Sequence, residues 1–455
     1  MTEEPWLQGA KNVLSNLKLR ASWGSIGDQS VASSLYIPTM SLLTDYWQHS
    51  GVRDYAFSTP GLVASDISWQ RIETLDFGVD LSLFNAFNIT FDWYRRTTKD
   101  MIVGMEGLSY NIGASAPQGN FGQLHTDGWE LSVNYGHLFD NGLSLSVTAA
   151  IADAVTTIDE YGTAKSVSGW YNGKTYGEIW GYRVDRLFQN DDFKWENGAL
   201  VAATDAYGRY YVYADGKDYA TQGKITSGNL ISGPGDVKFK DLNGDGVIDN
   251  GKLLIDDHGD LDIIGNTTPR YEYSFRVDAA WKGIDFSMFW QGIGKRDMLG
   301  SSWLTVPGFN ITGDGGSAQC FVADFWYETK DASGNVIEAN YDAFYPRAAS
   351  LGRSRSFNMT DNDRYMLNMA YLRLKNVTLG YTLPQKLTRK AFIDKLRFYV
   401  SLENFLTFDH LNGIPIDVEE VSGYSYLNSS NYNQSFAGIG APAFKSASVG
   451  VQLTF

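Results

Sequence analysis

The sequence predicts an all-β protein whose strands form an antiparallel transmembrane β-barrel. Two observations carry this prediction: ten segments alternate between apolar and polar residues, and the connections between them alternate between long and short. Side chains in a strand point to opposite faces with a period of two, so each segment has an apolar face and a polar face. Transmembrane barrels keep short periplasmic turns on one side and long extracellular loops on the other.

The segment at 371–408 shows the pattern most clearly, as one β-hairpin. Its alternation breaks between Leu374 and Val377, which predicts a bulge near Lys375–Asn376. Pro384 is expected to end the first strand, because proline cannot donate a hydrogen bond to a ladder.

The other eight segments are expected at 17–26, 71–83, 87–93, 129–135, 143–151, 271–281, 284–291 and 447–455. Strand lengths of about 10–13 residues are expected, which match a tilted crossing of a bilayer. The short connections lie near 84–86, 139–142, 282–283 and 384–394, and Asp140-Asn141-Gly142 is typical of a tight hairpin turn. The long connections are 27–70, 99–126, 154–269, 294–363 and 406–443.

The polar face of these strands indicates a water-filled interior, with the apolar face toward lipid. Burying ionised groups in hydrocarbon would cost several kcal/mol each, and that face carries Asp76, Asp80, Asp92, Glu130, Glu272, Arg276, Asp278, Asp285, Arg373, Arg397 and Glu403. Aromatic residues are good strand formers in any β protein. Their clustering near the segment ends, however, favours a membrane girdle, formed by Trp93, Trp129, Tyr271, Trp290, Tyr135, Trp281 and Tyr381.

The composition excludes some partners. A net charge of −15 argues against nucleic acid and fits neutral or cationic ligands, although simple solubility explains it equally well. The single cysteine, Cys320, excludes an internal disulfide and has no metal-ligand spacing around it. Residues 1–10 lack the features of a signal peptide, and no apolar run approaches the roughly 18 residues of a spanning helix.

Several ordered stretches resemble one family. They are NFGQLHTDGWELSVNY at 120–135, GDVKFKDLNGDGVID at 235–249, IIGNTTPRYEYSFRVDAAWKGIDFSMFWQGIGKRDM at 263–298, and YLRLKNVTLGYTLP with LRFYVSLENFLTF at 371–384 and 396–408. A weaker match covers DFWYETKD and YPR, at 324–331 and 345–347. Together they resemble the C-terminal part of the barrel of SusC-like TonB-dependent outer-membrane transporters.

The resemblance implies that residues 1–455 form about ten of about 22 barrel strands, with the plug domain and signal peptide absent from the chain. It implies import of oligosaccharides or peptides across the outer membrane, energy from the TonB complex, and a SusD-like lipoprotein as a lid over the extracellular loops. No catalytic residue and no enzymatic activity are expected on this reading.

One loop has the spacing of a calcium site. Oxygen ligands recur at positions 1, 3, 5, 7 and 9 of a Ca²⁺ loop, with Gly246 at its sharp turn; they are Asp241, Asn243, Asp245, the carbonyl of Val247, and Asp249. Position 12 is Lys252 instead of glutamate, so Asp256 or Asp257 would have to complete the shell. The alternative is an Asx-rich turn that holds no ion.

The long loops also carry candidate ligand-binding rings, because flat aromatic side chains stack on sugars and peptides. The candidates are Trp170, Trp180, Tyr182, Trp303 and Trp326, and the alternative is that these rings only pack the loops together. A second function is an outer-membrane hydrolase, whose one His–Asp cluster would be His258 with Asp256, Asp257 and Asp260. A third is a non-membrane β protein that binds glycans.

Overall fold

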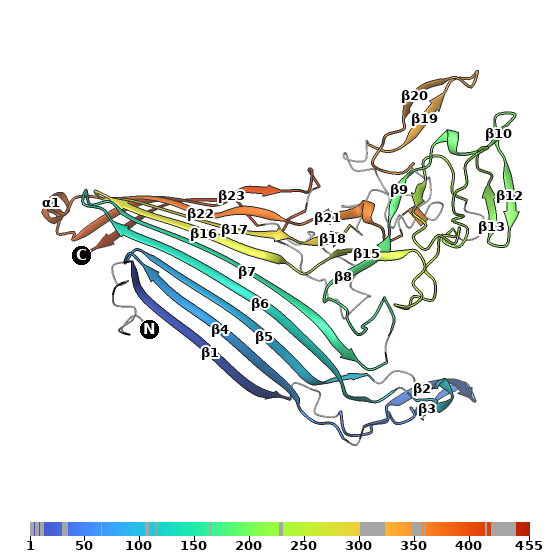
Figure 1. Cartoon of the computed structure of the whole chain (residues 1–455), viewed down its shortest axis with the longest axis horizontal. Coiled ribbons are helices and arrows are strands. Elements are labelled where there is room, and N and C mark those ends of the chain that lie inside the picture. Colours follow the sequence, from blue (N-terminus) through green and yellow to red (C-terminus); the bar gives the residue numbers. More distant parts are fainter. Residues whose placement is uncertain are drawn as a thin grey trace. The chain divides into compact units, whose positions relative to one another are not determined.

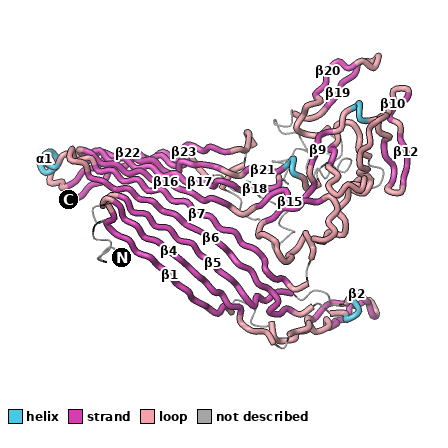
Figure 2. The backbone as a smooth tube through the Cα atoms, in the orientation of Figure 1, coloured by secondary structure: helices cyan, strands magenta, loops and turns pink. Residues whose placement is uncertain are grey.

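A computed structural model describes residues 4, 9, 13–29, 35–64, 66–104, 109–114, 116–163, 165–226, 231–300, 324–347, 357–358, 360–414, 416–419 and 443–455. The chain divides into two compact units: unit 1 is Met1–His137 with Thr148–Tyr176, and unit 2 is Leu138–Val147 with Gly177–Phe455. Strands make up most of the regular structure of each unit (Figure 2).

Unit 1 is built on five long antiparallel strands in the order β1-β4-β5-β6-β7. Their bounds are β1 Leu14–Asp28, β4 Gln70–Leu83, β5 Phe87–Gly104, β6 Gln118–Leu138 and β7 Ser144–Tyr161, the last two reaching into unit 2 at the turn that joins them. The hairpin of β2 (Leu42–His49) and β3 (Val52–Phe57) and the short helix η2 (Tyr110–Ile112) belong to the connections. Within unit 1, the β2–β3 hairpin lies at the opposite end of the strands from the β4–β5 turn (Figure 1).

Unit 2 has five further long strands, in the order β16-β17-β22-β23-β24. They are β16 Arg270–Trp281, β17 Ile284–Lys295, β22 Tyr371–Thr382, β23 Lys395–Asp409 and β24 Ser446–Thr454. The turn that holds α1 (Gln385–Thr388) and η7 (Arg389–Ala391) lies at one end of these strands, and the long connections lie at the other (Figure 1). No helix in the described ranges has the length and apolar character needed to cross a membrane.

The long connections of unit 2 fold into short elements of their own. These are β8 Glu178–Tyr182, β9 Val184–Leu187, η3 Asn190–Asp192, β10 Trp195–Glu196, β11 Ala199–Leu200, β12 Ala202–Asp205, β13 Gly208–Tyr211, β14 Val237–Phe239, β15 Leu261–Asn266, β18 Asp297–Leu299, β19 Tyr327–Lys330, β20 Val336–Asn340, η6 Asp363–Tyr365 and β21 Met366–Asn368. They pair as two-stranded ribbons, such as β8 with β15 and β19 with β20. We call this assembly the loop layer.

The turns and the bulge predicted from the sequence are confirmed. Lys282 and Gly283 both adopt positive φ (48° and 87°), which a two-residue hairpin turn requires. Gly142, at φ 81°, donates to Phe139 and closes the β6–β7 turn. The register of β22 against β17 and β23 skips Lys375, so the bulge lies where the alternation breaks.

The apolar face of the long strands is exposed. Leu379 on β22 is 56% exposed and Val449 on β24 is 82% exposed, and Phe77, Phe398 and Val451 on this face are exposed as well. Phe275 and Val277 are half-buried among their neighbours, and Leu374 is buried where β22 meets the loop layer. Rings also stack across neighbouring strands, as Phe275 does on Trp290 at 5.7 Å. A soluble protein would bury such a surface, so the structure supports a location of this face in the hydrocarbon of a bilayer.

The opposite face of the strands is polar and internally paired. Arg20 on β1 contacts Asp80 on β4 at 3.0 Å and Asp92 on β5 at 2.8 Å. Arg397 on β23 likewise forms a two-pronged ion pair with Asp285 on β17. The expected inversion, with charge on the face that would line a lumen and apolar residues on the other face, is therefore present in the long strands of both units.

Several strands are longer than the predicted 10–13 residues, which corrects the expected loop 99–126. β5 has 18 residues and β6 has 21. Beyond the facing pair Trp93 and Trp129, toward the long connections, the face of unit 1 that is apolar at the other end of the strands carries charged residues. These residues are Glu73, Arg95, Lys99, His125, Asp127 and Asp159. Backbone pairing continues there although the apolar signal that marks a strand in the sequence has ended.

The buried core of unit 2 lies in the loop layer and at the ends of the strands beside it. One cluster joins Met298, Met369, Tyr371, Leu411 and Val418. A second cluster joins Ile179, Leu299, Tyr345 and Tyr365. The loop layer is therefore a packed structure with its own hydrophobic interior.

A matched pair of substitutions tests which face contacts lipid. Val400→Arg should impair assembly by roughly 2–4 kcal/mol near the bilayer centre, because its side chain lies on the apolar face. Ser401→Arg should be tolerated, because Ser401 is on the polar face beside Asn376. The folded fraction in lipid vesicles, read by heat-modifiable gel mobility, measures both. Equal damage at the two positions would contradict the assignment.

Candidate functional site

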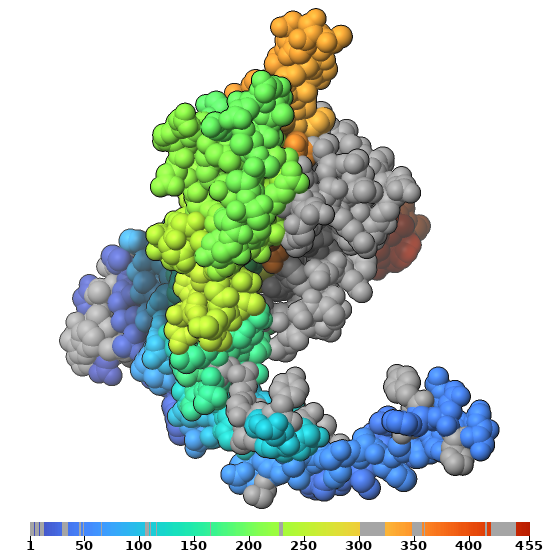
Figure 3. Space-filling model, turned by 90° about the vertical axis from the view of Figure 1, so that its right-hand side faces the viewer, coloured from blue at the N-terminus to red at the C-terminus, as the bar shows by residue number. Residues whose placement is uncertain are grey.

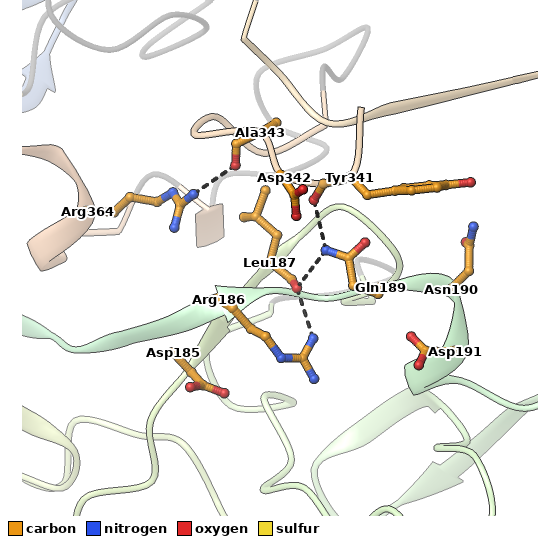
Figure 4. Close-up of a pocket in the computed structure, with 10 residues that line it drawn as sticks. All are labelled: Asp185, Arg186, Leu187, Gln189, Asn190, Asp191, Tyr341, Asp342, Ala343 and Arg364. Atoms are coloured by element: carbon orange, nitrogen blue, oxygen red, sulfur yellow. Dashed lines mark hydrogen bonds between the residues drawn. The ribbon is translucent and has the colours of Figure 1, made fainter. Parts of the chain in front are cut away.

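The loop layer contains a pocket of about 670 Å³. Residues 177–226 and 231–269, coloured green to yellow in Figure 3, lie together on this side of unit 2. The pocket lies between β9 with η3 and the segments that follow β20 and begin η6 (Figure 4). Its volume falls in the range of ligand sites in proteins. Its lining is Asp185, Arg186, Leu187, Gln189, Asn190, Asp191, Tyr341, Asp342, Ala343 and Arg364.

Gln189 ties the two walls of the pocket together. Its side-chain amide donates to the carbonyl of Tyr341 at 3.1 Å and to that of Leu187 at 3.3 Å (Figure 4). Its oxygen accepts a hydrogen bond from Trp326 Nε1 at 3.1 Å. Both ends of the amide are therefore used, and Gln189 links the two walls of the pocket as a structural element.

The cations of the pocket are already engaged. Arg364 donates to the carbonyl of Ala343 at 3.0 Å and to that of Phe344, and burial lowers the pKa of its guanidinium. Arg186 forms a two-pronged ion pair with Asp192, at 2.5 and 2.8 Å. Neither guanidinium is free to bind an anionic ligand.

Two adjacent carboxylates have opposite roles. The Asp192 side chain is 1% exposed and accepts from Arg186, Lys217, Tyr219 and the amide of Gln189, whereas Asp191 is 82% exposed. Burial alone would raise the pKa of Asp192, but these hydrogen bonds outweigh it and hold the pKa well below its ordinary value of 3.8. Asp192 organises the pocket wall while Asp191 faces solvent.

The surface that a ligand would meet is acidic and rich in acceptors. Asp185, Asp191 and Asp342 lie at three separate places around the pocket (Figure 4). Asp185 pairs with Lys238 at 2.8 Å and Asp191 with Lys217 at 3.3 Å, whereas Asp342 has no ion-pair or hydrogen-bond partner among the described residues. Such a surface favours ligands that bring hydrogen-bond donors, such as hydroxyl or ammonium groups.

The predicted calcium loop adopts a turn-rich conformation. Asp241 accepts backbone hydrogen bonds from Gly244 at 2.6 Å and from Gly246 at 2.9 Å, and both glycines have positive φ. Asn243 and Asp245 cap the next two turns. The sharp turn expected at Gly246 is therefore present, as it would be in a calcium loop and in an ion-free Asx turn alike.

A lysine lies at the position where a cation would be needed. Lys224 donates to Asp249, which lowers the pKa of Asp249 and raises the pKa of Lys224. Lys252, at position 12, pairs with Asp257 at 2.8 Å. Across the described ranges, no three His, Cys, Asp or Glu side chains converge as they would around a metal. Calcium binding by Asp241, Asn243, Asp245, Val247 and Asp249 stays a prediction.

The His–Asp cluster does not form a catalytic pair. Nδ1 of His258 is buried without a hydrogen-bond partner in the described part of the chain, and the ring packs on Trp180 at 5.3 Å. Asp257 is paired with Lys252, and Asp260 accepts backbone hydrogen bonds from Leu242 and Asp249. No base is therefore oriented by a carboxylate here.

The five aromatic candidates have different environments. Tyr182 and Trp326 are buried, Tyr182 against Phe239 and Trp326 against Tyr341, so their rings contact protein. Trp170 and Trp180 are half-buried, and ligand stacking on them stays a prediction. Trp303 lies outside the described residues.

Sequence reasoning missed most of the pocket. Gln189 comes from the connection between β7 and β16, and Tyr341 and Arg364 come from the connection between β17 and β22; these residues match no motif. Asp191 and Asp192 stand out in the sequence as adjacent acidic residues, but adjacency does not show that Asp192 is buried and Asp191 exposed. The other pocket residues have no sequence signal, because the pocket forms only when the loops pack together.

Comparison with known proteins now identifies the fold. Residues 9–233 match the family described as TonB dependent receptor-like, beta-barrel. These residues therefore form part of a TonB-dependent receptor-like β-barrel domain. It is an outer-membrane barrel chain, as the exposed apolar face requires.

Proteins similar in sequence to this chain are also named TonB-dependent receptors. It is 24% identical over 433 residues to TonB-dependent receptor P3 of Formosa agariphila, covering 91% of this chain and 37% of the relative. It is 24% identical over 426 residues to TonB-dependent receptor SusC of Bacteroides thetaiotaomicron, covering 92% and 36%. These relatives are named as receptors, which supports a non-enzymatic reading.

The receptor chain also resembles solved structures. The RagAB peptide transporter superposes with a TM-score of 0.61 at 20% identity, covering 98% of this chain and 41% of that one. The same importer in a closed-closed state gives 0.62 at 18% identity. At these identities the likeness shows the fold alone. The chain spans about two fifths of the length of the proteins it matches.

Replacing Asp192 should loosen the pocket wall. Asp192→Asn removes a buried charge that faces Arg186 and Lys217, so residues 185–219 should lose about 3 kcal/mol of local stability. The control Asp191→Asn removes an equal charge from an exposed site and should change little. Hydrogen exchange of the amides in this segment measures both, and equal protection in the two variants would contradict the role of Asp192.

Acid should also lower the local stability of residues 185–219, because it protonates Asp192. Because the pKa of Asp192 is lowered in the folded state, its stabilisation is fully present above the ordinary value of 3.8 and is lost as the pH falls below it. Exchange in 185–219 should thus be steady from pH 7 to about pH 4 and rise at lower pH in the wild type. Asp192→Asn should lack that additional rise.

Calcium titration tests the predicted loop. Isothermal titration of the metal-stripped full-length protein should show one calcium site that Asp241→Ala abolishes. Asp331→Ala is the matched control, because Asp331 caps a similar Asx turn in the β19–β20 hairpin without calcium-loop spacing. Lys224→Gln should tighten calcium binding, since Lys224 competes for Asp249. No calcium-dependent heat in the wild type would refute the site.

Proposed function

We propose that the full-length protein carrying this chain imports oligosaccharides or peptides across the outer membrane, with energy delivered through TonB. The observation that supports this most is a packed loop layer with a ligand-sized pocket, on the long-loop side of a receptor-type barrel sheet. Passive pores need no such structure. A receptor that selects large nutrients does, because binding precedes transport.

The chemistry of the pocket supports a cargo rich in donors. Three carboxylates line the pocket, and one of them, Asp342, has no partner among the described residues, while both guanidinium groups of the pocket are engaged internally. Neutral hydroxylated oligosaccharides and peptides with basic residues both meet this requirement, and anionic cargo does not. One of the two classes is also the cargo of a structural neighbour, the RagAB peptide transporter.

We propose further that a SusD-like lipoprotein covers the loop layer. The surface of the loop layer carries exposed aromatic and apolar residues, such as Trp195 and Ile337. Exposed rings of this kind are typical of interaction surfaces. The hydrolase alternative has no support in the described residues, because His258 has no carboxylate partner.

Uptake by a deletion strain tests the proposal. Cells lacking the gene should fail to grow on the cognate oligosaccharide or peptide mixture as sole nutrient, and the wild-type gene should restore growth. Affinity isolation of the tagged receptor should co-purify a lipoprotein. Unchanged uptake of both nutrient classes in the deletion strain would refute import.

A charge reversal tests the pocket. Asp342→Lys should slow uptake at limiting nutrient by at least tenfold, because it places a cation in an acceptor-rich site. Asp215→Lys makes the same charge change on an exposed residue of the loop layer that does not line the pocket, and should leave uptake unchanged. Equal effects would show that the pocket does not contact cargo.

A further inference from the structure

The connection between β22 and β23 differs from the other short turns. Lys282 and Gly283 alone reverse the chain between β16 and β17, whereas residues 383–394 build a small helical knob from α1 and η7. The knob is ordered: Leu383 donates to Leu396 at its neck, and Gln385 donates to Asp394 at 2.6 Å across it.

The knob exposes two large apolar side chains. Leu387 is 56% exposed and Phe392 is 92% exposed, the highest value among the large apolar residues of the described chain. The knob continues from the apolar face of the strands, since Phe398 on β23 and Leu453 on β24 are exposed beside it. A surface continuous with the lipid belt is the natural place for such residues.

The knob is also basic. Lys386, Arg389 and Lys390 are exposed and have no ion-pair partner among the described residues, while the one acid of the knob, Asp394, is held by Gln385. The chain as a whole carries a net charge of −15. The knob is therefore a positively charged region on an acidic chain, and its three cations lie beside two exposed apolar residues.

We propose that the knob is a membrane anchor that binds the surface of anionic phospholipids in the inner leaflet of the outer membrane. Leu387 and Phe392 insert at the level of the headgroups, and the ammonium and guanidinium groups contact lipid phosphates. Basic segments with apolar residues bind membranes through this combination of forces. The inference depends on the barrel orientation, with short turns facing the periplasm, and is independent of the cargo.

A fluorescent label tests insertion. In the full-length protein with Cys320→Ser, Phe392→Cys is labelled with an environment-sensitive dye and reconstituted into vesicles of phosphatidylethanolamine and phosphatidylglycerol. Lipids spin-labelled near the headgroup should quench this dye at least twofold more than a dye at Asn141→Cys, the tip of the β6–β7 turn. A second label at Leu387→Cys should agree, which guards against a folding defect in either variant.

Removing the charges tests the lipid headgroup. When Lys386→Gln, Arg389→Gln and Lys390→Gln are added to the labelled Phe392→Cys protein, at least half of the lipid quenching in these vesicles should be lost. The labelled Phe392→Cys protein with its three cations intact should show the same loss in vesicles of phosphatidylcholine alone. Lys282→Gln is the control and should retain the quenching. Stronger quenching by aqueous iodide than by lipid overturns the anchor. Shielding from both quenchers also overturns it, because a protein would then cover the knob.

Discussion

The structure depends on which solvent each face of its strands meets. Arg20, Asp80 and Asp92 form ion pairs on one face, while Leu379 and Val449 lie exposed on the other. Hydrocarbon cannot solvate the first set, and water would not favour the second. This inversion places the strands in a bilayer, and the buried hydrophobic clusters lie outside the membrane-facing part of the strands.

The hydrophobic core is in the loop layer, which gives the long connections their role. Clusters around Met369 and Tyr365 pack loops that the sequence separates widely. Asp192 and Asp236 add buried carboxylates, each held by an arginine and further donors. The pocket is a consequence of this packing, and its cations are used to build its walls. What remains for a ligand is a surface of acceptors.

The boundary between membrane and water is visible along single strands. On β5, one face passes from Phe91 and Trp93 to Arg95 and Lys99 with no break in register. The backbone hydrogen bonds are indifferent to this change, because each strand satisfies its neighbour in either solvent. The strands of unit 1 can therefore extend beyond the bilayer. Within unit 2, the basic knob lies at the end of the strands away from the long connections.

Sequence alone determined the strands, their short turns, the bulge at Lys375 and the inversion of faces, because a period of two and the φ demands of glycine are local properties. It underestimated β5 and β6, since charged pairs such as Arg95 with Asp127 stabilise a ladder without an apolar pattern. Only the tertiary structure decided that Tyr182 and Trp326 are buried, that His258 has no carboxylate partner in the described chain, and that Gln189 and Asp342 share a pocket. Those outcomes depend on contacts between residues far apart in the chain, and no local pattern encodes them.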